Sequence, residues 1–78
     1  MQILLKLYTT SHCHLCELAL ELVLQQCAAT QIALIEIEND ENLLETYATR
    51  IPVLQRFDTL AELNWPFSEH DLRDFLSA

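Results

Sequence analysis

Two cysteines lie three residues apart in the stretch Thr9-Thr10-Ser11-His12-Cys13-His14-Leu15-Cys16. The run before it, Gln2 to Tyr8, is rich in branched and aromatic side chains and too short for a helix, so we predict a strand there. From Cys16 to Ala29 the apolar residues recur at helical spacing, which predicts a helix. The two thiols are therefore expected at a junction between a strand and a helix.

This junction favours a reactive thiol. The first N–H groups of a helix have no intrahelical partner and carry partial positive charge, which stabilises an anion. We expect Ser11 to cap the helix, with Cys13 near its first turn and Cys16 deeper on the same face. Such surroundings lower the pKa of a cysteine from about 8.5 to between about 3.5 and 7.5. Protonated His14 would further stabilise a Cys13 thiolate, and Glu17 would oppose it.

The composition restricts the classes of protein. Seventy-eight residues with 51% hydrophobic residues predict a single small domain over 1–78. A net charge of −8 argues against nucleic acids and anionic membrane surfaces as partners, and no apolar run approaches the roughly 20 residues of a membrane span. The first residues lead directly into a strand without a basic segment and an apolar leader, so we expect a cytoplasmic protein, and a monomer.

Three cysteines are too few for a secreted domain held together by disulfides, and their number is odd. On a helical projection that starts at Cys16, Cys27 falls in the middle of the buried stripe. A helical rise over eleven residues puts these two thiols roughly 16 Å apart, beyond the reach of a disulfide. Cys27 is therefore predicted to be a small core residue.

The rest of the chain predicts further strands and helices. In order these are a strand from Gln31 to Glu38, a helix capped by Asn39 or Asp40 through Ala48, strands from Ile51 to Phe57 and from Leu60 to Trp65 joined by a turn at Asp58-Thr59, and a helix through Leu76 with a capping box of Ser68 and Asp71. The resulting β-α-β-α-β-β-α order predicts an α/β fold. Its four-stranded mixed sheet has a parallel pair, a closing antiparallel hairpin and flanking helices.

Three segments together resemble the thioredoxin-fold superfamily, and most closely its glutaredoxin-like proteins. They are C-H-L-C-E-L-A, Y-A-T-R-I-P-V-L and E-L-N-W-P-F-S-E-H-D-L, and the resemblance extends over essentially the whole chain. The resemblance implies that Cys13 is the nucleophile and Cys16 the resolving thiol. It also implies that Pro52 follows a cis peptide bond next to the pair, and that Ile51 offers its backbone to a substrate strand.

The chain departs from the glutathione-using members of this family. His14-Leu15 stands where those proteins usually have Pro-Tyr, Thr10 where they often have a basic residue, and residues 65–68 where they have Gly-Gly. Arg50 could bind a substrate carboxylate in compensation, although an exposed Arg beside a strand is the commoner explanation. We expect no bound cofactor, with glutathione as a candidate reductant or co-substrate.

Three functions fit these residues. The leading hypothesis is thiol–disulfide exchange with protein disulfides or glutathione mixed disulfides, with a reductase or glutathione as electron donor. The second is a thiol-bearing binding module without general redox activity. The third is metal binding, because His12, Cys13, His14 and Cys16 offer four ligands in five residues. Structural zinc normally joins two distant ligand pairs, and the sequence has no second pair, so we expect no metal.

Overall fold

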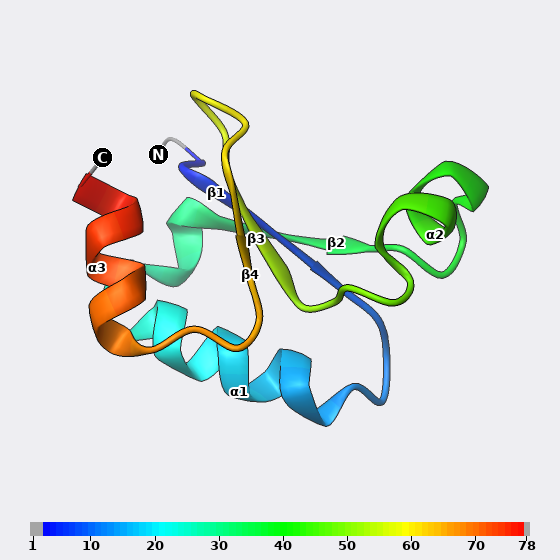
Figure 1. Ribbon diagram of the computed structural model, residues 1–78, viewed down its shortest axis with the longest axis horizontal. Coiled ribbons are helices and arrows are strands. Elements are labelled where there is room, and N and C mark those ends of the chain that lie inside the picture. The colour runs from blue at the N-terminus through cyan, green and yellow to red at the C-terminus, as the bar shows by residue number, and fades with distance from the viewer. Residues whose placement is uncertain (1–2, 78) are drawn as a thin grey trace.

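A four-stranded mixed sheet forms the centre of the computed structural model, which describes residues 3–77 (Figure 1). The elements are β1 (Leu5–Thr9), α1 (His14–Leu24), the short 3-10 turn η1 (Ala29–Gln31), β2 (Ile32–Glu36), α2 (Glu41–Tyr47), β3 (Val53–Arg56), β4 (Glu62–Asn64) and α3 (Glu69–Ser77). Apart from η1, which the sequence analysis did not predict, this is the expected β-α-β-α-β-β-α order, and the α/β fold class is confirmed. No helix within the described range is long and apolar enough to cross a membrane.

The strands lie in the order β2-β1-β3-β4. β1 and β2 are parallel and are joined through α1, as predicted, whereas β3 runs antiparallel to both β1 and β4. Tyr8, close to the end of β1, pairs with Val53, the first residue of β3. The two cysteines follow β1 and Pro52 precedes β3. Both segments therefore leave the sheet at the same end of these two neighbouring strands.

The two faces of the sheet bury different side chains because successive residues of a strand point in opposite directions. Leu5 and Leu7 of β1 belong to a core cluster that includes Val23 of α1 and Leu72 of α3. Tyr8 faces the other side and packs in a second cluster that includes residues of α2 and β3. Helices α1 and α3 thus cover one face, and α2 covers the cysteine end of the other.

The start of α1 differs from the prediction. The helix begins at His14, and its N-cap is Cys13, whose backbone is extended (φ −103°, ψ 101°) and whose sulfur accepts the N–H of Cys16. Ser11 was the wrong cap. Its hydroxyl lies too early in the chain and instead donates to Oε2 of Glu38 at 3.2 Å.

The end of α1 also differs. The helix stops at Leu24 rather than Ala29, and the backbone is extended at Ala28 before η1 begins. Cys27 therefore lies beyond the helix, where its N–H still donates to the Val23 carbonyl at 2.9 Å. It is partly buried against the core cluster of α1 and α3, so its assignment as a core residue holds although its place on a helix does not.

The predicted caps of the other two helices are confirmed. Asp40 accepts the N–H groups of Asn42 and Leu43, and Ser68 and Asp71 exchange the two bonds of a capping box. The last three predicted strands were too long at both ends. For example, β4 begins at Glu62 rather than Leu60, because Leu60 has a left-handed backbone (φ 64°) that belongs to the turn. β1 instead continues to Thr9, one residue beyond the prediction, and the predicted start at Gln2 lies outside the described residues.

Candidate functional site

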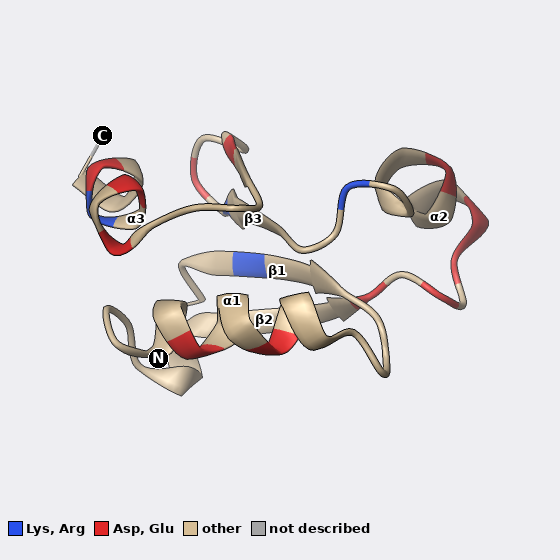
Figure 2. Ribbon diagram, turned by 60° about the horizontal axis from the view of Figure 1, so that its bottom comes forward, with Lys and Arg blue, Asp and Glu red and all other residues tan. Residues whose placement is uncertain are grey.

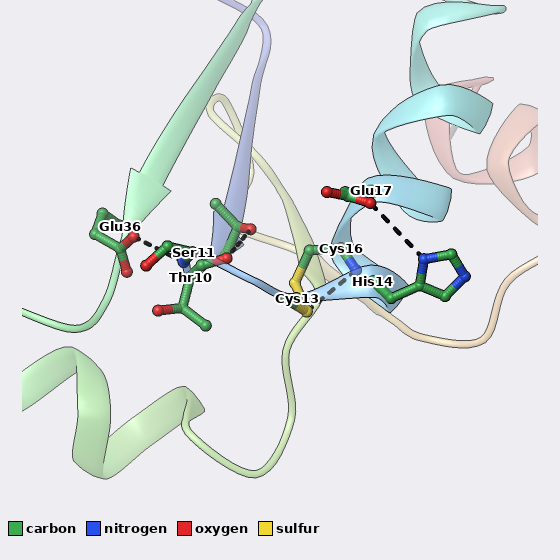
Figure 3. The surroundings of a disulfide bond; sticks show 8 residues. Thr10, Ser11, Cys13, His14, Cys16, Glu17 and Glu36 are labelled. Atoms are coloured by element: carbon green, nitrogen blue, oxygen red, sulfur yellow. Dashed lines mark hydrogen bonds and ion pairs between the residues drawn. A yellow bond between two sulfur atoms is a disulfide. The ribbon is translucent and has the colours of Figure 1, made fainter.

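The two cysteines form a disulfide at the N-terminus of α1, with their Cα atoms 5.2 Å apart (Figure 3). The sulfur of Cys13 takes the place of an N-cap oxygen and accepts the N–H of Cys16 at 3.2 Å. The carbonyl of Cys13 accepts the N–H of Glu17 at 3.1 Å, which begins the helical hydrogen bonds. The sulfur is therefore held where the helix presents its unpaired donors, which would stabilise a negative charge on it once the disulfide is reduced.

The two sulfurs differ in exposure. Cys16 is buried with 4% of its surface exposed, whereas Cys13 is only partly buried. Leu15, between them, is 48% exposed, and His12 and His14 are exposed as well. Cys13 is therefore the more accessible of the two cysteines.

Glu36, the last residue of β2, holds the segment between β1 and the disulfide. Its carboxylate accepts the backbone N–H of Ser11 at 3.1 Å (Figure 3). It also accepts the backbone N–H of Glu38 at 2.9 Å. The Glu38 N–H, followed by the Thr10 hydroxyl, lowers the pKa of this carboxyl. Sequence reasoning missed Glu36; once β1 and β2 are known to be parallel, the pairing of Thr9 with Glu36 brings it beside this segment.

His14 does not contact the sulfurs. Its ring is turned away from the disulfide and lies with Nδ1 3.7 Å from Oε2 of Glu17 (Figure 3). Both side chains are highly exposed. The expected stabilisation of a Cys13 thiolate by His14 therefore has no support in this arrangement.

The segment before β3 carries the residues that the resemblance assigned to substrate binding. The Ile51–Pro52 peptide bond is cis, and Pro52 is buried. The Ile51 N–H donates to the Tyr47 carbonyl at 3.0 Å, so a substrate strand that pairs with Ile51 must use its carbonyl. A second cis peptide bond, Trp65–Pro66, precedes α3, and the sequence analysis did not predict it.

Arg50 belongs to a network with α2 and β4. Its Nη2 donates to Glu62 at 2.5 Å and to Asn64 at 3.1 Å, and its guanidinium lies 5.1 Å from the ring centre of Tyr47. The Tyr47 hydroxyl donates to the same Glu62 carboxylate at 2.6 Å and lowers its pKa, with Arg50 acting in the same direction. Burial and the Glu62 carboxylate in turn raise the pKa of Tyr47. The guanidinium of Arg50 is thus already engaged within the protein.

The candidate metal ligands do not gather around a common point. Among residues 3–77, no three His, Cys, Asp or Glu side chains are grouped so that they could hold a metal ion. The third cysteine, Cys27, lies beyond the other end of α1, and burial raises the pKa of its thiol.

A comparison with protein families matches residues 4–77 to the Glutaredoxin-like domain (DUF836). The chain belongs to this glutaredoxin-like family. Its fold and its Cys13–Cys16 pair, at disulfide distance, fit a Cys-x-x-Cys redox module of the thioredoxin-like class.

Two solved structures of a structural genomics target protein from X. campestris resemble this glutaredoxin-like chain. The X-ray structure has a TM-score of 0.84 and 36% sequence identity, and the match covers 94% of this chain and 95% of that one. The solution structure has a TM-score of 0.80 at 36% identity, with 96% and 94% covered. None of the curated proteins compared with the chain matches it.

Proposed function

We propose that this glutaredoxin-like protein is a thiol–disulfide oxidoreductase in which Cys13 is the nucleophile and Cys16 the resolving thiol. The observation that carries the proposal is the position of the Cys13 sulfur. It is partly exposed and accepts a helix N–H at 3.2 Å, while Cys16 is buried behind it. A sulfur at this position is stabilised as a thiolate, which is the reactive form of a cysteine.

The reaction runs in two exchanges. In the first, the Cys13 thiolate attacks one sulfur of a target disulfide, the target S–S bond breaks, and one target thiolate leaves. In the second, the Cys16 thiolate attacks the Cys13 sulfur, which forms the Cys13–Cys16 disulfide and releases the second target thiolate. Two electrons pass from the protein to the target, and the released thiolates take up protons from the solvent.

The substrates proposed are protein disulfides and glutathione mixed disulfides. Pro52 and the carbonyl of Ile51 would contact the substrate chain, because they precede β3 at the end of the strands where the cysteines lie. We expect the exposed His14 ring, which is turned away from the sulfurs, to contact the same substrate at a distance from the reacting disulfide. A substrate carboxylate could bind Arg50 only by competing with Glu62 and Asn64.

The oxidised protein must be reduced again before it can act. An external dithiol, a reductase or glutathione would supply the two electrons, and no cofactor bound to this chain is needed for the exchanges themselves. We also expect the protein to act as a cytoplasmic monomer.

Trapping of the first intermediate tests the assignment of the two cysteines. In a Cys27→Ala background, the variant Cys16→Ser should accumulate a mixed disulfide between Cys13 and the substrate, because the resolving thiol is missing. The matched variant Cys13→Ser should accumulate none, since Cys16 is buried. Intact mass under non-reducing conditions measures both.

Two outcomes would overturn this assignment. A mixed disulfide in Cys13→Ser but not in Cys16→Ser would reverse the two roles. Failure of the reduced protein to exchange with any disulfide, small or protein-bound, would leave a binding module rather than an oxidoreductase.

A further inference from the structure

A groove of about 340 Å³ opens beside the disulfide, along the start of α1 and the outer strand β2. Cys13 and Cys16 both line it, so a molecule in the groove lies against the reacting sulfurs. Leu7, Leu20 and Leu34 give it an apolar wall. This volume is at the lower end of the range of about 300–1,000 Å³ found for ligand pockets, which suits a side chain of a docked polypeptide better than a large cofactor.

Leu34 makes the outer side of the groove accessible to a partner. β2 is at the edge of the sheet and, among residues 3–77, pairs only with β1. Leu34 is 56% exposed although its neighbour in register, Leu7, is 1% exposed. An apolar side chain placed against Leu34 would therefore cover surface that this chain leaves in water.

The groove is negatively charged. Glu17 and Glu36 line it, and Figure 3 shows that they come from different elements, the first turn of α1 and the end of β2. Hydrogen bonds from neutral donors keep the pKa of Glu36 low, so it carries its charge at neutral pH. None of the groove-lining residues is Lys or Arg.

The Lys and Arg residues lie outside α1 and β2, the two elements along which the groove opens (Figure 2). The sequence has four, against twelve Asp and Glu. Three form ion pairs, Arg50 with Glu62, Arg56 with Asp58 and Arg73 with Glu69, and Lys6 lies over the ring of Phe57. An anionic substrate such as oxidised glutathione would meet two carboxylates in the groove, and neither Lys nor Arg, whereas a basic segment would meet complementary charge.

We infer that this groove selects disulfides in basic polypeptide segments. An apolar residue next to the substrate cysteine lies against Leu20 and Leu34, and flanking Lys or Arg side chains meet Glu17 and Glu36. The inference rests on the proposed oxidoreductase function and names its substrate class. The chemistry is that of the two exchanges above, with the peptide disulfide reduced and the Cys13–Cys16 dithiol oxidised.

Single-turnover exchange with matched peptides tests this selection. The protein is reduced with dithiothreitol, separated from the reductant, and mixed with one of two short cyclic disulfide peptides. Both peptides have a Leu beside one half-cystine, and they differ only in whether the flanking residues are Lys or Glu. Acid quenching and mass analysis give the rate of oxidation of the protein. At about 0.02 M salt the Lys peptide should react about tenfold faster, since attraction of this kind raises association rates by about 10-fold or more. At about 1 M salt, where charges are screened beyond about 3 Å, the two rates should differ by less than about twofold.

A pair of variants with equal charge change locates the effect. Leu34→Lys adds a positive charge in the groove at an exposed position, and Leu60→Lys adds one in the β3–β4 turn, where the side chain is 60% exposed. That turn follows Arg56, which pairs with Leu5 at the opposite end of β1 from the cysteines. Leu34→Lys should abolish or reverse the preference for the Lys peptide, whereas Leu60→Lys should keep it within about twofold of the original. Glu17→Gln, which does not touch the apolar wall, should reduce the preference by about twofold and replaces Leu34→Lys if that variant fails to fold.

The outcomes separate the two proposals. Equal rates for the two peptides at low salt, or a faster Glu peptide, would overturn the inference and leave the oxidoreductase intact. An equal effect of Leu34→Lys and Leu60→Lys would show that net charge, and not the groove, makes the selection. If neither the peptides nor a small-molecule disulfide oxidise the reduced protein, the proposed function is overturned and the inference with it.

Discussion

A cysteine lies near each end of α1, and the surroundings of the two cysteines differ. At the N-terminal end, Cys13 caps the helix and its sulfur accepts a backbone N–H in a partly exposed position. Beyond the C-terminal end, Cys27 packs against the apolar core, and burial raises the pKa of its thiol. We therefore expect a reactive thiol near the N-terminal end of the helix and an unreactive one beyond its C-terminal end.

The ends also differ in how they are held. A carboxylate of the neighbouring strand, Glu36, binds the segment that leads into the N-terminal end. The C-terminal end closes with local bonds, in which Gln26 and Cys27 donate to the Val23 carbonyl at 3.0 and 2.9 Å. No basic residue stands in the last turn of α1. A carboxylate therefore binds the backbone at the cysteine end. At the other end a carboxylate, that of Glu69 on α3, accepts only a side-chain hydrogen bond, from Gln26 at 3.3 Å.

Alkylation of the reduced protein should give the largest contrast between these ends. For each unit by which the pKa of one thiol lies below that of another, it has nearly tenfold more thiolate at neutral pH. Its thiolate is about threefold less nucleophilic, so its reaction rate is about threefold higher. Burial of Cys27 adds to this. We expect Cys13 to react with iodoacetamide at pH 7 at least about tenfold faster than Cys27, measured by peptide mass analysis in a Cys16→Ser background.

Denaturation with urea supplies the control for this comparison. Both thiols should react at similar rates in the unfolded chain, because neither the helix nor the core then exists. A contrast that persisted in urea would mean that local sequence, and not the position along α1, sets the reactivity.

Glu36→Gln tests how the N-terminal end is held. A carboxyl whose pKa is lowered in the folded state stabilises the fold above its ordinary pKa, and this contribution is lost as the pH falls through the lowered value. The variant should therefore unfold at less urea than the original protein at pH 7, and the difference should vanish toward pH 3. Glu45→Gln removes an equal charge from an exposed position on α2 and should change the midpoint little. A pH-independent difference would show that Glu36 acts through packing instead.

Cys27→Ala tests the opposite end in the opposite pH range. A thiol whose pKa is raised in the folded state contributes stability that is present in full below its ordinary pKa and is lost as the pH rises through the raised value. Oxidised protein isolates Cys27, since the disulfide cysteines do not titrate. We expect the original protein to lose more stability than Cys27→Ala above about pH 8.5. At neutral pH the substitution itself should cost about 1 kcal/mol or less. Urea midpoints against pH measure both, and parallel curves would contradict the burial of this thiol.

The features that sequence reasoning predicted correctly are local ones. The helix caps at Asp40 and at Ser68 with Asp71 depend on side chains within three residues of the bonds they make. The order of strands and helices follows from hydrophobic spacing, and the position of the disulfide follows from the order.

The features that it missed depend on contacts between distant segments. Ser11 is a better cap by composition than Cys13, yet its hydroxyl is taken by Glu38, 27 residues away in sequence. Glu36 reaches the cysteine segment only through the register of two parallel strands. Glu62 forms its ion pair with Arg50 because the hairpin of β3 and β4 brings the two residues together. Spacing along one segment contains no information about such partners.

The smallest effect expected concerns Glu17, which places a negative charge in the first turn of α1, close to the sulfur that the helix stabilises. Glu17→Gln should shift the pH midpoint of Cys13 alkylation downward, because removal of a like charge favours the thiolate. For exposed charges several ångströms apart in water the shift is a few tenths of a pH unit. Glu21→Gln, one turn further along α1, is the matched control and should shift the midpoint less.

A shift that survives about 1 M salt would require a direct contact, whereas the through-solvent effect argued here is screened. An upward shift would mean that the ion pair of Glu17 with His14 governs the thiol, and that the helix terminus is the weaker influence.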